Sequence, residues 1–470
     1  MSATAATPAT PPEQAAPLSL KTRLTFGVGD LSAAIVTIVI SFFQLFFLTE
    51  IAGLRPDIAG TILLVARIFD AVSDPLMGWL SDVVYARTGK RRIWMLYGAV
   101  PFGVFFALQW LVPPLDTTGK FLYYLLIIPL FDIAFTMVNV PYTALTPELT
   151  RDYHERTTLN SFRFAFSIGG SLGAGVLHPL LVGAFANPQL GYAIAGVSMG
   201  VFSVLPILIC YAGLPDAPRA TPERTTAPPL SSVFTQVQAV LSNRPYLFVV
   251  GIYMVSWLAL QITAAIIPFY TTYLLQNEDV LALAILGLQG MALLCLFGWN
   301  SISHRIGKQN TYLIGAAIWI GAQLALFFVQ PEQVALALFI AAVAGIGVST
   351  SYLIPWSLVP DVVDYHELQT GQHQEGMFYG LLVFAQKLGL ALGLFIVGVV
   401  LAGQGFDQNL TVAQQPESAV FAIRLLISLL PAGLLVVGMV LAFFFPITQQ
   451  QHAAIAAELA QRRATGNERR

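Results

Sequence analysis

Residues 141–148 read PYTALTPE and are followed by DYHE at 152–155. A closely similar pattern occurs in the second half of the chain, where residues 355–361 read PWSLVPD and are followed by DYHE at 364–367. Each copy follows a predominantly apolar segment. A motif of this kind in both halves predicts a chain built from two structural repeats.

A second pair of short motifs repeats in the same order. Gly78-Trp79 precedes RTGK at 87–90, and Gly298-Trp299 precedes RIGK at 305–308. On a count of twelve predicted spans, both pairs of motifs fall after corresponding spans of the two halves. Because chance would hardly place both pairs in matching register, we expect two parallel six-helix repeats.

The composition is that of a membrane protein. Hydrophobic residues make up 56% of the 470 residues and charged residues 10%, with a mean hydropathy of +0.72. Soluble domains carry roughly 25% charged residues, so an ordinary soluble protein is excluded. The formal net charge of -2 gives no nucleic-acid surface. Cys210 and Cys295 lie in apolar runs and support neither a disulfide framework nor a thiolate metal site.

The distribution of Lys and Arg predicts the orientation in the membrane. Outside the predicted spans, only Arg55 and Lys120 fall on the side opposite to the other basic residues, so both termini are expected in the cytoplasm. The expected domains are a disordered cytoplasmic tail at 1–20, an N-terminal six-helix bundle at 21–214, a cytoplasmic linker at 215–244, a C-terminal six-helix bundle at 245–446 and a cytoplasmic tail at 447–470.

A few charged residues lie inside the predicted spans, where each costs at least roughly 2.5 kcal/mol on insertion. They are Asp30, Arg67, Asp70, Asp74, Asp132, Arg163, Lys387 and Arg424. Arg67, Asp70 and Asp74 are three and four residues apart, which places them on one helix face. Two carboxylates on one face can bind a small cation or share a proton. The alternative is a static Arg-Asp pair that locks helices together.

The other intramembrane charges allow more than one interpretation. Lys387 lies in the otherwise apolar stretch 381–394, so we expect it to pair with the aspartates of the second helix or with a polar substrate. Asp30 can cap a helix end or bind substrate. Asp132 can pack near a helix end or belong to the site, and Arg424 is expected to anchor at the membrane interface.

Charged residues near the predicted cytoplasmic helix ends are candidates for an inner gate, in which ion pairs break and re-form. Simple positive-inside anchoring is the alternative for the basic ones. The candidate gating residues are Arg67, Asp82, Arg91, Arg92, Glu148, Asp361 and Asp364. His154 and His366 belong to the repeated motif and are interpreted as structural. No HExxH, Walker or CxxC motif occurs, so we expect no enzyme.

Two segments resemble the glycoside-pentoside-hexuronide:cation symporter family of the major facilitator superfamily. They are VARIFDAVSDPLMGW at 65–79 with GKRRIW at 89–94, and PDVVDYHELQTG at 360–371 with Lys387 following. The resemblance extends from about Leu20 to about Pro446. It implies an all-α membrane protein with the twelve-helix major facilitator fold, alternating access, and symport with Na+ or H+ and no further cofactor.

The resemblance also implies sites. The cation-binding candidates are Asp70, Asp74, Thr136 and Asn139. The substrate-binding candidates, several of them chosen for hydrogen bonds or aromatic faces, are Asp30, Tyr142, Arg163, Tyr352, Trp356, Gln386 and Lys387. The chain has Ala33-Ala34 and Asn139 where the family's galactoside carriers have acidic residues, so an acidic sugar clamp is largely absent.

The sequence therefore predicts a cation-coupled secondary active symporter in a bacterial inner membrane. Its expected partners are a small-molecule substrate and the coupling cation. A sugar, glycoside or related polar solute is the leading substrate, and a monomer in the lipid bilayer is expected. A sodium-dependent symporter of lysophospholipids or other amphiphiles is the first alternative, because that group shares the aspartate pair and the lysine. An uncoupled uniporter or membrane sensor is an alternative of another class.

Overall fold

A computed structural model of the chain describes residues 18–88, 92–150, 153–214, 237–238, 240–371 and 375–467. Three gating candidates fall outside this description: residue Arg91, and the side chains of Asp82 and Glu148. Most of the predicted N-terminal tail and most of the predicted linker also lie outside the described residues. Near two of the predicted domain boundaries, Ser19 caps a helix that begins at Leu20, and another helix begins at Arg244.

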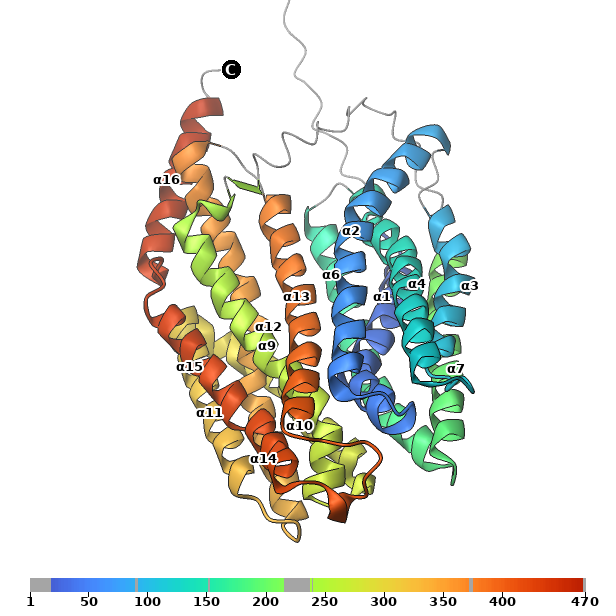
Figure 1. The fold of residues 1–470 in the computed structure, drawn as a ribbon. Helices are drawn as coiled ribbons and strands as arrows, with labels where there is room; N and C mark the ends of the chain where they lie inside the picture. The colour runs from blue at the N-terminus through green and yellow to red at the C-terminus, as the bar shows by residue number, and fades with distance from the viewer. Residues whose placement is uncertain are drawn as a thin grey trace, which may run out of the picture.

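The described chain is almost entirely helical (Figure 1). The helices of the first half are α1 (Leu20–Val39), η1 (Ile40–Gln44), η2 (Phe47–Ile51), α2 (Pro56–Thr88), α3 (Ile93–Leu108), α4 (Thr117–Thr143), α5 (Thr146–Leu149), α6 (Tyr153–Gly183) and α7 (Pro188–Gly213). Those of the second half are α9 (Arg244–Phe269), η3 (Tyr270–Leu274), η4 (Glu278–Val280), α10 (Leu281–Ile306), α11 (Lys308–Phe328), α12 (Val334–Thr370), α13 (Glu375–Gly403), η5 (Val412–Gln414), α14 (Glu417–Ile427), α15 (Leu429–Phe443) and α16 (Gln449–Asn467).

Several helix ends are set by capping side chains. Ser19 accepts a hydrogen bond from the backbone N–H of Thr22, and Asp116 accepts one from that of Gly119. These bonds satisfy amides that the first helical turn leaves without partners. At the other end of α12, Gly371 has a φ of 71°, a left-handed conformation that glycine adopts without strain and that stops the helix.

The two halves pack in the same pattern. In the first half α1 packs on α6 and α7, α2 on α4, and α3 on α4 and α7. In the second half α9 packs on α13 and α15, α10 on α12, and α11 on α12 and α15. The two groups of helices lie side by side in Figure 1. Equivalent helices thus make equivalent contacts, as a duplicated bundle requires.

The helices that join the halves include two equivalent pairs, α2 with α13 and α6 with α10, and α9 also contacts η1. The first pair approaches very closely near the start of α2, where a Cβ atom added at Gly398 would lie 2.2 Å from the carbonyl oxygen of Pro56. Small residues permit such backbone contact between membrane helices. We call this end, where η2 (Phe47–Ile51) and η3 (Tyr270–Leu274) lie, the Glu50 end, and the opposite end, where α7 ends at Gly213 and α9 begins at Arg244, the linker end.

Within the described residues, ten helical segments are long and apolar enough to span a membrane. Neither α2 nor α3 is among them. Helix α2 is long enough but carries Arg67, Asp70 and Asp74, and α3 is apolar but only 16 residues long. Both pack among the spanning helices, and the count of twelve spans stays a prediction.

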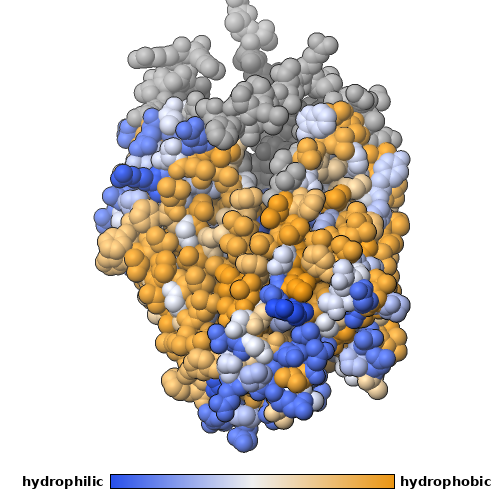
Figure 2. Space-filling view, viewed as in Figure 1, coloured by the Kyte–Doolittle hydropathy of each residue, from blue (hydrophilic) through white to orange (hydrophobic). Residues whose placement is uncertain are grey.

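The outer surface matches a lipid environment. Large apolar side chains are strongly exposed, among them Leu294, Phe297, Phe328 and Phe443, each at least 70% exposed. Figure 2 shows hydrophobic residues dominating the middle of one face, with hydrophilic residues gathered mainly toward its ends. Apolar surface on this scale is covered by a bilayer rather than by water.

The close contact of α2 with α13 gives a stability prediction. Replacing Gly398 by Ala places a methyl group against the Pro56 carbonyl oxygen, so we expect the free energy of unfolding to fall by about 1–3 kcal/mol. The measurement is the thermal unfolding midpoint in detergent. Gly380→Ala on the same helix is the matched control, because nothing lies within 4 Å of its added Cβ. Equal midpoints for both variants would contradict this packing.

Candidate functional site

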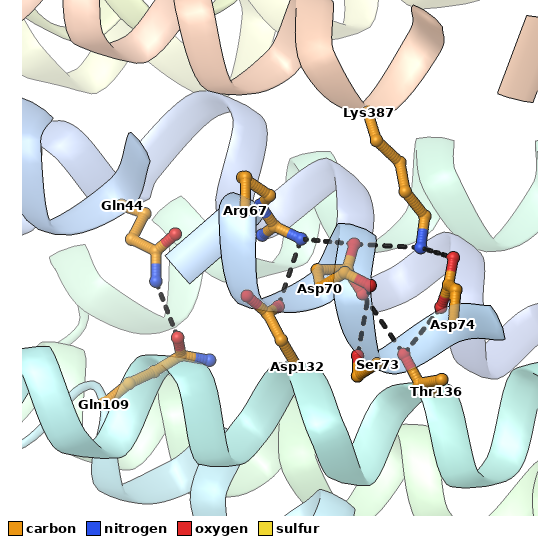
Figure 3. A network of polar contacts seen from close by, with 9 residues as sticks. All are labelled: Gln44, Arg67, Asp70, Ser73, Asp74, Gln109, Asp132, Thr136 and Lys387. Carbon is orange, nitrogen blue, oxygen red and sulfur yellow. Dashed lines mark hydrogen bonds and ion pairs between the residues drawn. The ribbon is translucent and has the colours of Figure 1, made fainter. Parts of the chain in front are cut away.

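A cluster of charged side chains occupies the middle of α2, facing α4 and α13 (Figure 3). Lys387 of α13 contacts both aspartates of α2: its Nζ atom lies 2.8 Å from Asp70 Oδ2 and also pairs with Asp74 Oδ2. On the side away from Lys387, Thr136 Oγ1 lies 3.1 Å from Asp70 Oδ1 and 2.9 Å from Asp74 Oδ1. The expected pairing of Lys387 with the α2 aspartates is therefore present.

Arg67 extends the cluster toward α4. Its guanidinium lies 3.0 Å from Asp132 Oδ1 and 3.8 Å from Asp70 Oδ2. The sequence left the role of Asp132 open, and the structure places this carboxylate in the cluster. Arg67 was also a gating candidate, but it lies here among the intramembrane carboxylates. Asp132 and Thr136 are four residues apart on α4, a spacing that could have indicated their common face.

The cluster is buried unevenly. The side chains of Asp70 and Asp132 are 0% exposed, whereas those of Lys387 and Asp74 are 21% and 28% exposed. Asp74 and Lys387 thus form the accessible side of the cluster, and an ion entering it would meet them first.

The charges of the cluster do not balance. With every group ionised, Asp70, Asp74 and Asp132 carry three negative charges, and Arg67 and Lys387 carry two positive ones. One negative charge is left over in a place where an uncompensated charge is costly. Carboxylate and hydroxyl oxygens are the ligands that hard cations prefer. The arrangement can therefore take up one further monovalent cation or one proton.

Asn139, the fourth cation-binding candidate, lies elsewhere on α4. It lines a small pocket with residues of α1 and α3, including Gly29, Ser32 and Phe102. Within the described chain Asn139 makes no hydrogen bond to Asp70 or Asp74, and its role as a cation ligand stays a prediction.

The substrate candidates of the first half form a compact group. Arg163 of α6 pairs with Asp30 of α1 at 2.8 Å, and its guanidinium lies over the ring of Tyr142 at 5.2 Å from the ring centre. The Tyr142 hydroxyl donates a hydrogen bond to the carbonyl oxygen of Phe26. Two candidates chosen separately from the sequence are therefore partners of each other.

The substrate candidates of the second half belong to an aromatic cluster. Trp356 lies between Tyr253 and Tyr379, at ring distances of 6.1 Å and 5.8 Å. Tyr352 packs edge-on against Trp257 at 5.9 Å, and its hydroxyl donates to Gln289. The sequence singled out only Tyr352 and Trp356 of this cluster.

Gln386 has a simpler placement: it is half-buried on α13 beside Lys387. Lys387 itself, also a substrate candidate, lies in the charged cluster, where its ammonium contacts Asp70 and Asp74.

Two of the described gating candidates, Asp361 and Asp364, contact groups of the second half. Asp361 accepts from Lys308 at 2.7 Å, and Asp364 lies 3.1 Å from His452 of α16. Arg92 donates to the carbonyl oxygen of Leu214. Asp361 is thus paired with Lys308, within the second half.

The chain matches known transporters over nearly its whole length. Residues 25–449 match the family described as MFS/sugar transport protein. An uncharacterized symporter of Synechocystis is 38% identical over 95% of this chain and 97% of that protein. A putative glycoside/cation symporter of Escherichia coli is 29% identical over 96% and 97% of the two chains.

Solved structures show the same fold. The D-xylose-proton symporter superposes with a TM-score of 0.65 over 90% of this chain and 97% of that chain, at 17% identity. At this identity the likeness shows a common fold.

The contact of Arg67 with Asp132 gives a second prediction. Arg67→Met leaves the buried Asp132 without its counter-charge, so we expect the free energy of unfolding to fall by about 3–5 kcal/mol. Adding Asp132→Asn should recover most of this loss, since the amide carries no charge. Chemical or thermal denaturation of both variants measures the change.

The matched control is Arg55→Met, whose pair with Asp57 is exposed and should contribute less than about 1 kcal/mol. A double variant no more stable than Arg67→Met would show that the two groups do not act as a pair.

Proposed function

Since the chain belongs to the MFS/sugar transport protein family, we propose that it is a cation-coupled secondary active symporter that works by alternating access. Its relatives are named symporters, and the chain is a multi-pass membrane transporter rather than an enzyme. The coupling ion, the substrate and the residues that bind them are the parts of the proposal argued below.

The observation that carries the proposal is the unbalanced charge at Asp70, Asp74 and Asp132. One cation or proton at the α2 aspartates would neutralise the cluster. Asp74 is the more accessible of the two, so the ion enters on its side. Thr136 lies within hydrogen-bond distance of both aspartates and offers a further oxygen ligand.

Lys387 connects ion binding to movement of the two halves. Its ammonium comes from α13 in the second half, and it contacts carboxylates of α2 in the first half. A cation at these carboxylates repels the ammonium and weakens this link between the halves. Ion binding thereby changes the relative stability of the two states, which is what coupling requires.

The proposed substrate is a sugar, glycoside or related polar solute. Tyr352 and Trp356 offer aromatic faces that suit the apolar face of a sugar ring, and the Asp30–Arg163 pair offers hydrogen bonds from α1 and α6. Named relatives include a putative glycoside/cation symporter and an isoprimeverose transporter. An amphiphile remains the alternative substrate and is an outcome of the test below.

The proposed topology has twelve spans with both termini in the cytoplasm. It rests on the bias of Lys and Arg toward one side. The linker end then faces the cytoplasm, and the Glu50 end faces the opposite side. The close contact of Gly398 with Pro56 lies at the Glu50 end, so the structure corresponds to a state closed to the outside.

The ion proposal predicts a stability response. Na+, Li+ or protons should raise the thermal unfolding midpoint of the wild-type protein, because a ligand of the folded state stabilises it by about 2.7 kcal/mol at 100 times its Kd. Asp74→Asn should lose this response. Asp57→Asn is the control, since that carboxylate lies at the surface of the same helix. If the ion shifts the unfolding midpoint equally in all three proteins, Asp74 does not belong to the ion site.

The same assay with a panel of glycosides and lysophospholipids tests the substrate. We expect stabilisation by one glycoside together with the ion, and uptake of that glycoside into proteoliposomes driven by the ion gradient. Stabilisation by a lysophospholipid alone would identify the amphiphile carrier instead. Solute binding with no ion dependence would identify a uniporter or sensor.

A further inference from the structure

A carboxylic acid outside the charged cluster joins the two halves at the Glu50 end. Glu50 lies on η2, beyond the span Leu20–Gln44. Its Oε2 atom accepts a hydrogen bond from the hydroxyl of Tyr273 on η3 at 2.5 Å. The donor and the acceptor are 223 residues apart and belong to different halves. This bond therefore exists only while the two halves are together at this end.

The two partners occupy the same position in the two repeats. Residues 46–50 read FFLTE at the end of the first helix of the first half, and residues 269–273 read FYTTY at the end of the first helix of the second. Phe46 and Phe269, which begin these segments, also meet, with ring centres 5.0 Å apart. The contact lies where the two equivalent helices approach each other, a place that must separate if the halves rotate apart.

The surroundings of Glu50 do not favour a charged carboxylate. Its Oε1 atom is buried and has no hydrogen-bond partner within the described chain. Its partner Tyr273 is only 5% exposed and packs edge-on against Phe406. A carboxylate with one buried, unpaired oxygen costs free energy that the protonated acid avoids.

Among the described residues, no positively charged side chain pairs with Glu50. Tyr273 on η3 donates the hydrogen bond, Glu278 on η4 adds a negative charge nearby, and Tyr192 of α7 also faces the two acids. Lys120 of α4 is engaged by the carbonyl oxygen of Ala52. Arg55 pairs with Asp57 at the surface.

We propose that Glu50 is a proton-binding residue in its own right, separate from the Asp70–Asp74 site, and that its protonated form latches the two halves at the Glu50 end. The latch consists of Glu50, Tyr273 and the Phe46–Phe269 contact. This inference goes beyond the proposed function, because it holds whichever ion and solute the chain carries.

The sign of the pH effect follows from burial. Burial raises the pKa of Glu50 from 4.5 to about 7 in this closed arrangement; the hydrogen bond from Tyr273 lowers the pKa by less than burial raises it, and the nearby Glu278 adds to the rise. In an open arrangement Glu50 reaches water and regains its ordinary pKa. Protonation of Glu50 thus stabilises the closed state fully at a pH below the ordinary pKa of 4.5. This stabilisation is lost as the pH rises through the raised pKa of about 7. Since each pKa unit is tenfold in the equilibrium, we expect the ratio of closed to open molecules to fall at least about tenfold between pH 5 and pH 8.5.

Spin labels at the Glu50 end measure this ratio. Thr118→Cys at the start of α4 and Glu332→Cys between α11 and α12 place one exposed label on each half, in a Cys295→Ala background. The distance between the two labels is measured by pulsed electron–electron double resonance at pH 5 and pH 8.5, without sodium and without solute. We expect a short distance at pH 5 and a growing long-distance population at pH 8.5.

The variants separate the latch from other titrating groups. Glu50→Gln mimics the protonated acid and keeps the hydrogen bond. In this variant the distance between the labels should therefore stay short at both pH values. Tyr273→Phe removes the donor and should lengthen the distance already at pH 5. Asp57→Asn, a surface carboxylate at the same end, should behave like wild type.

Three results would overturn the latch: a wild-type distance that does not change with pH, a Glu50→Gln protein that responds as the wild type does, or a Tyr273→Phe protein indistinguishable from it. Asp74→Asn keeps the two proposals apart. If Asp74→Asn abolishes the pH dependence of the distance and Glu50→Gln does not, the titrating group belongs to the ion site and is not Glu50. If the response persists in Asp74→Asn, the latch stands even where the coupling proposal fails.

Discussion

An excess of negative charge, buried where α2, α4 and α13 meet, is the constraint on which the rest of the structure depends. Such a cluster is tolerated inside a membrane only if its groups pair with one another or with an ion. Arg67 and Lys387 each compensate part of it. In the proposed mechanism the remaining charge attracts a cation, and Lys387 connects ion binding to movement of the two halves, because its backbone belongs to the other half of the molecule.

The contacts between the two repeated halves are where ion binding would act. The halves meet through α2 with α13 and through α6 with α10, equivalent pairs in the two repeats. Along α2 the contact with α13 is backbone to backbone near Pro56 and electrostatic near Asp74. If the electrostatic contact is lost, the tight contact at the Glu50 end still holds the halves together, and Glu50 and Tyr273 add there the hydrogen bond that we propose to be strengthened by protonation. Two chemically different contacts therefore act on one rigid-body movement.

The sequence was sufficient wherever the signal is local or repeated. Helical spacing placed Arg67, Asp70 and Asp74 on one face, an apolar flank marked Lys387 as interior, and the duplicated motifs predicted equivalent halves. Apart from the pairing of Lys387 with the α2 aspartates, the contacts between distant segments could not be predicted, because no sequence spacing indicates the Arg67–Asp132 pair, the Asp30–Arg163 pair or the Glu50–Tyr273 bond. Asn139 was assigned to the cation site by resemblance alone, and the structure shows it lining a small pocket with residues of α1 and α3, so its role at the cation site stays a prediction.

Competition between Lys387 and the coupling ion for the same two carboxylates is the central claim. The most direct measurement is the ion dependence of the thermal unfolding midpoint in Lys387→Gln, titrated with sodium and with pH beside the wild type. Removing the ammonium should lower the half-saturating sodium concentration at least about tenfold or, if the ion is a proton, move the pH midpoint up by about one unit, the same tenfold change. Identical titrations in both proteins would contradict the claim, because the ammonium and the ion would then not share a site.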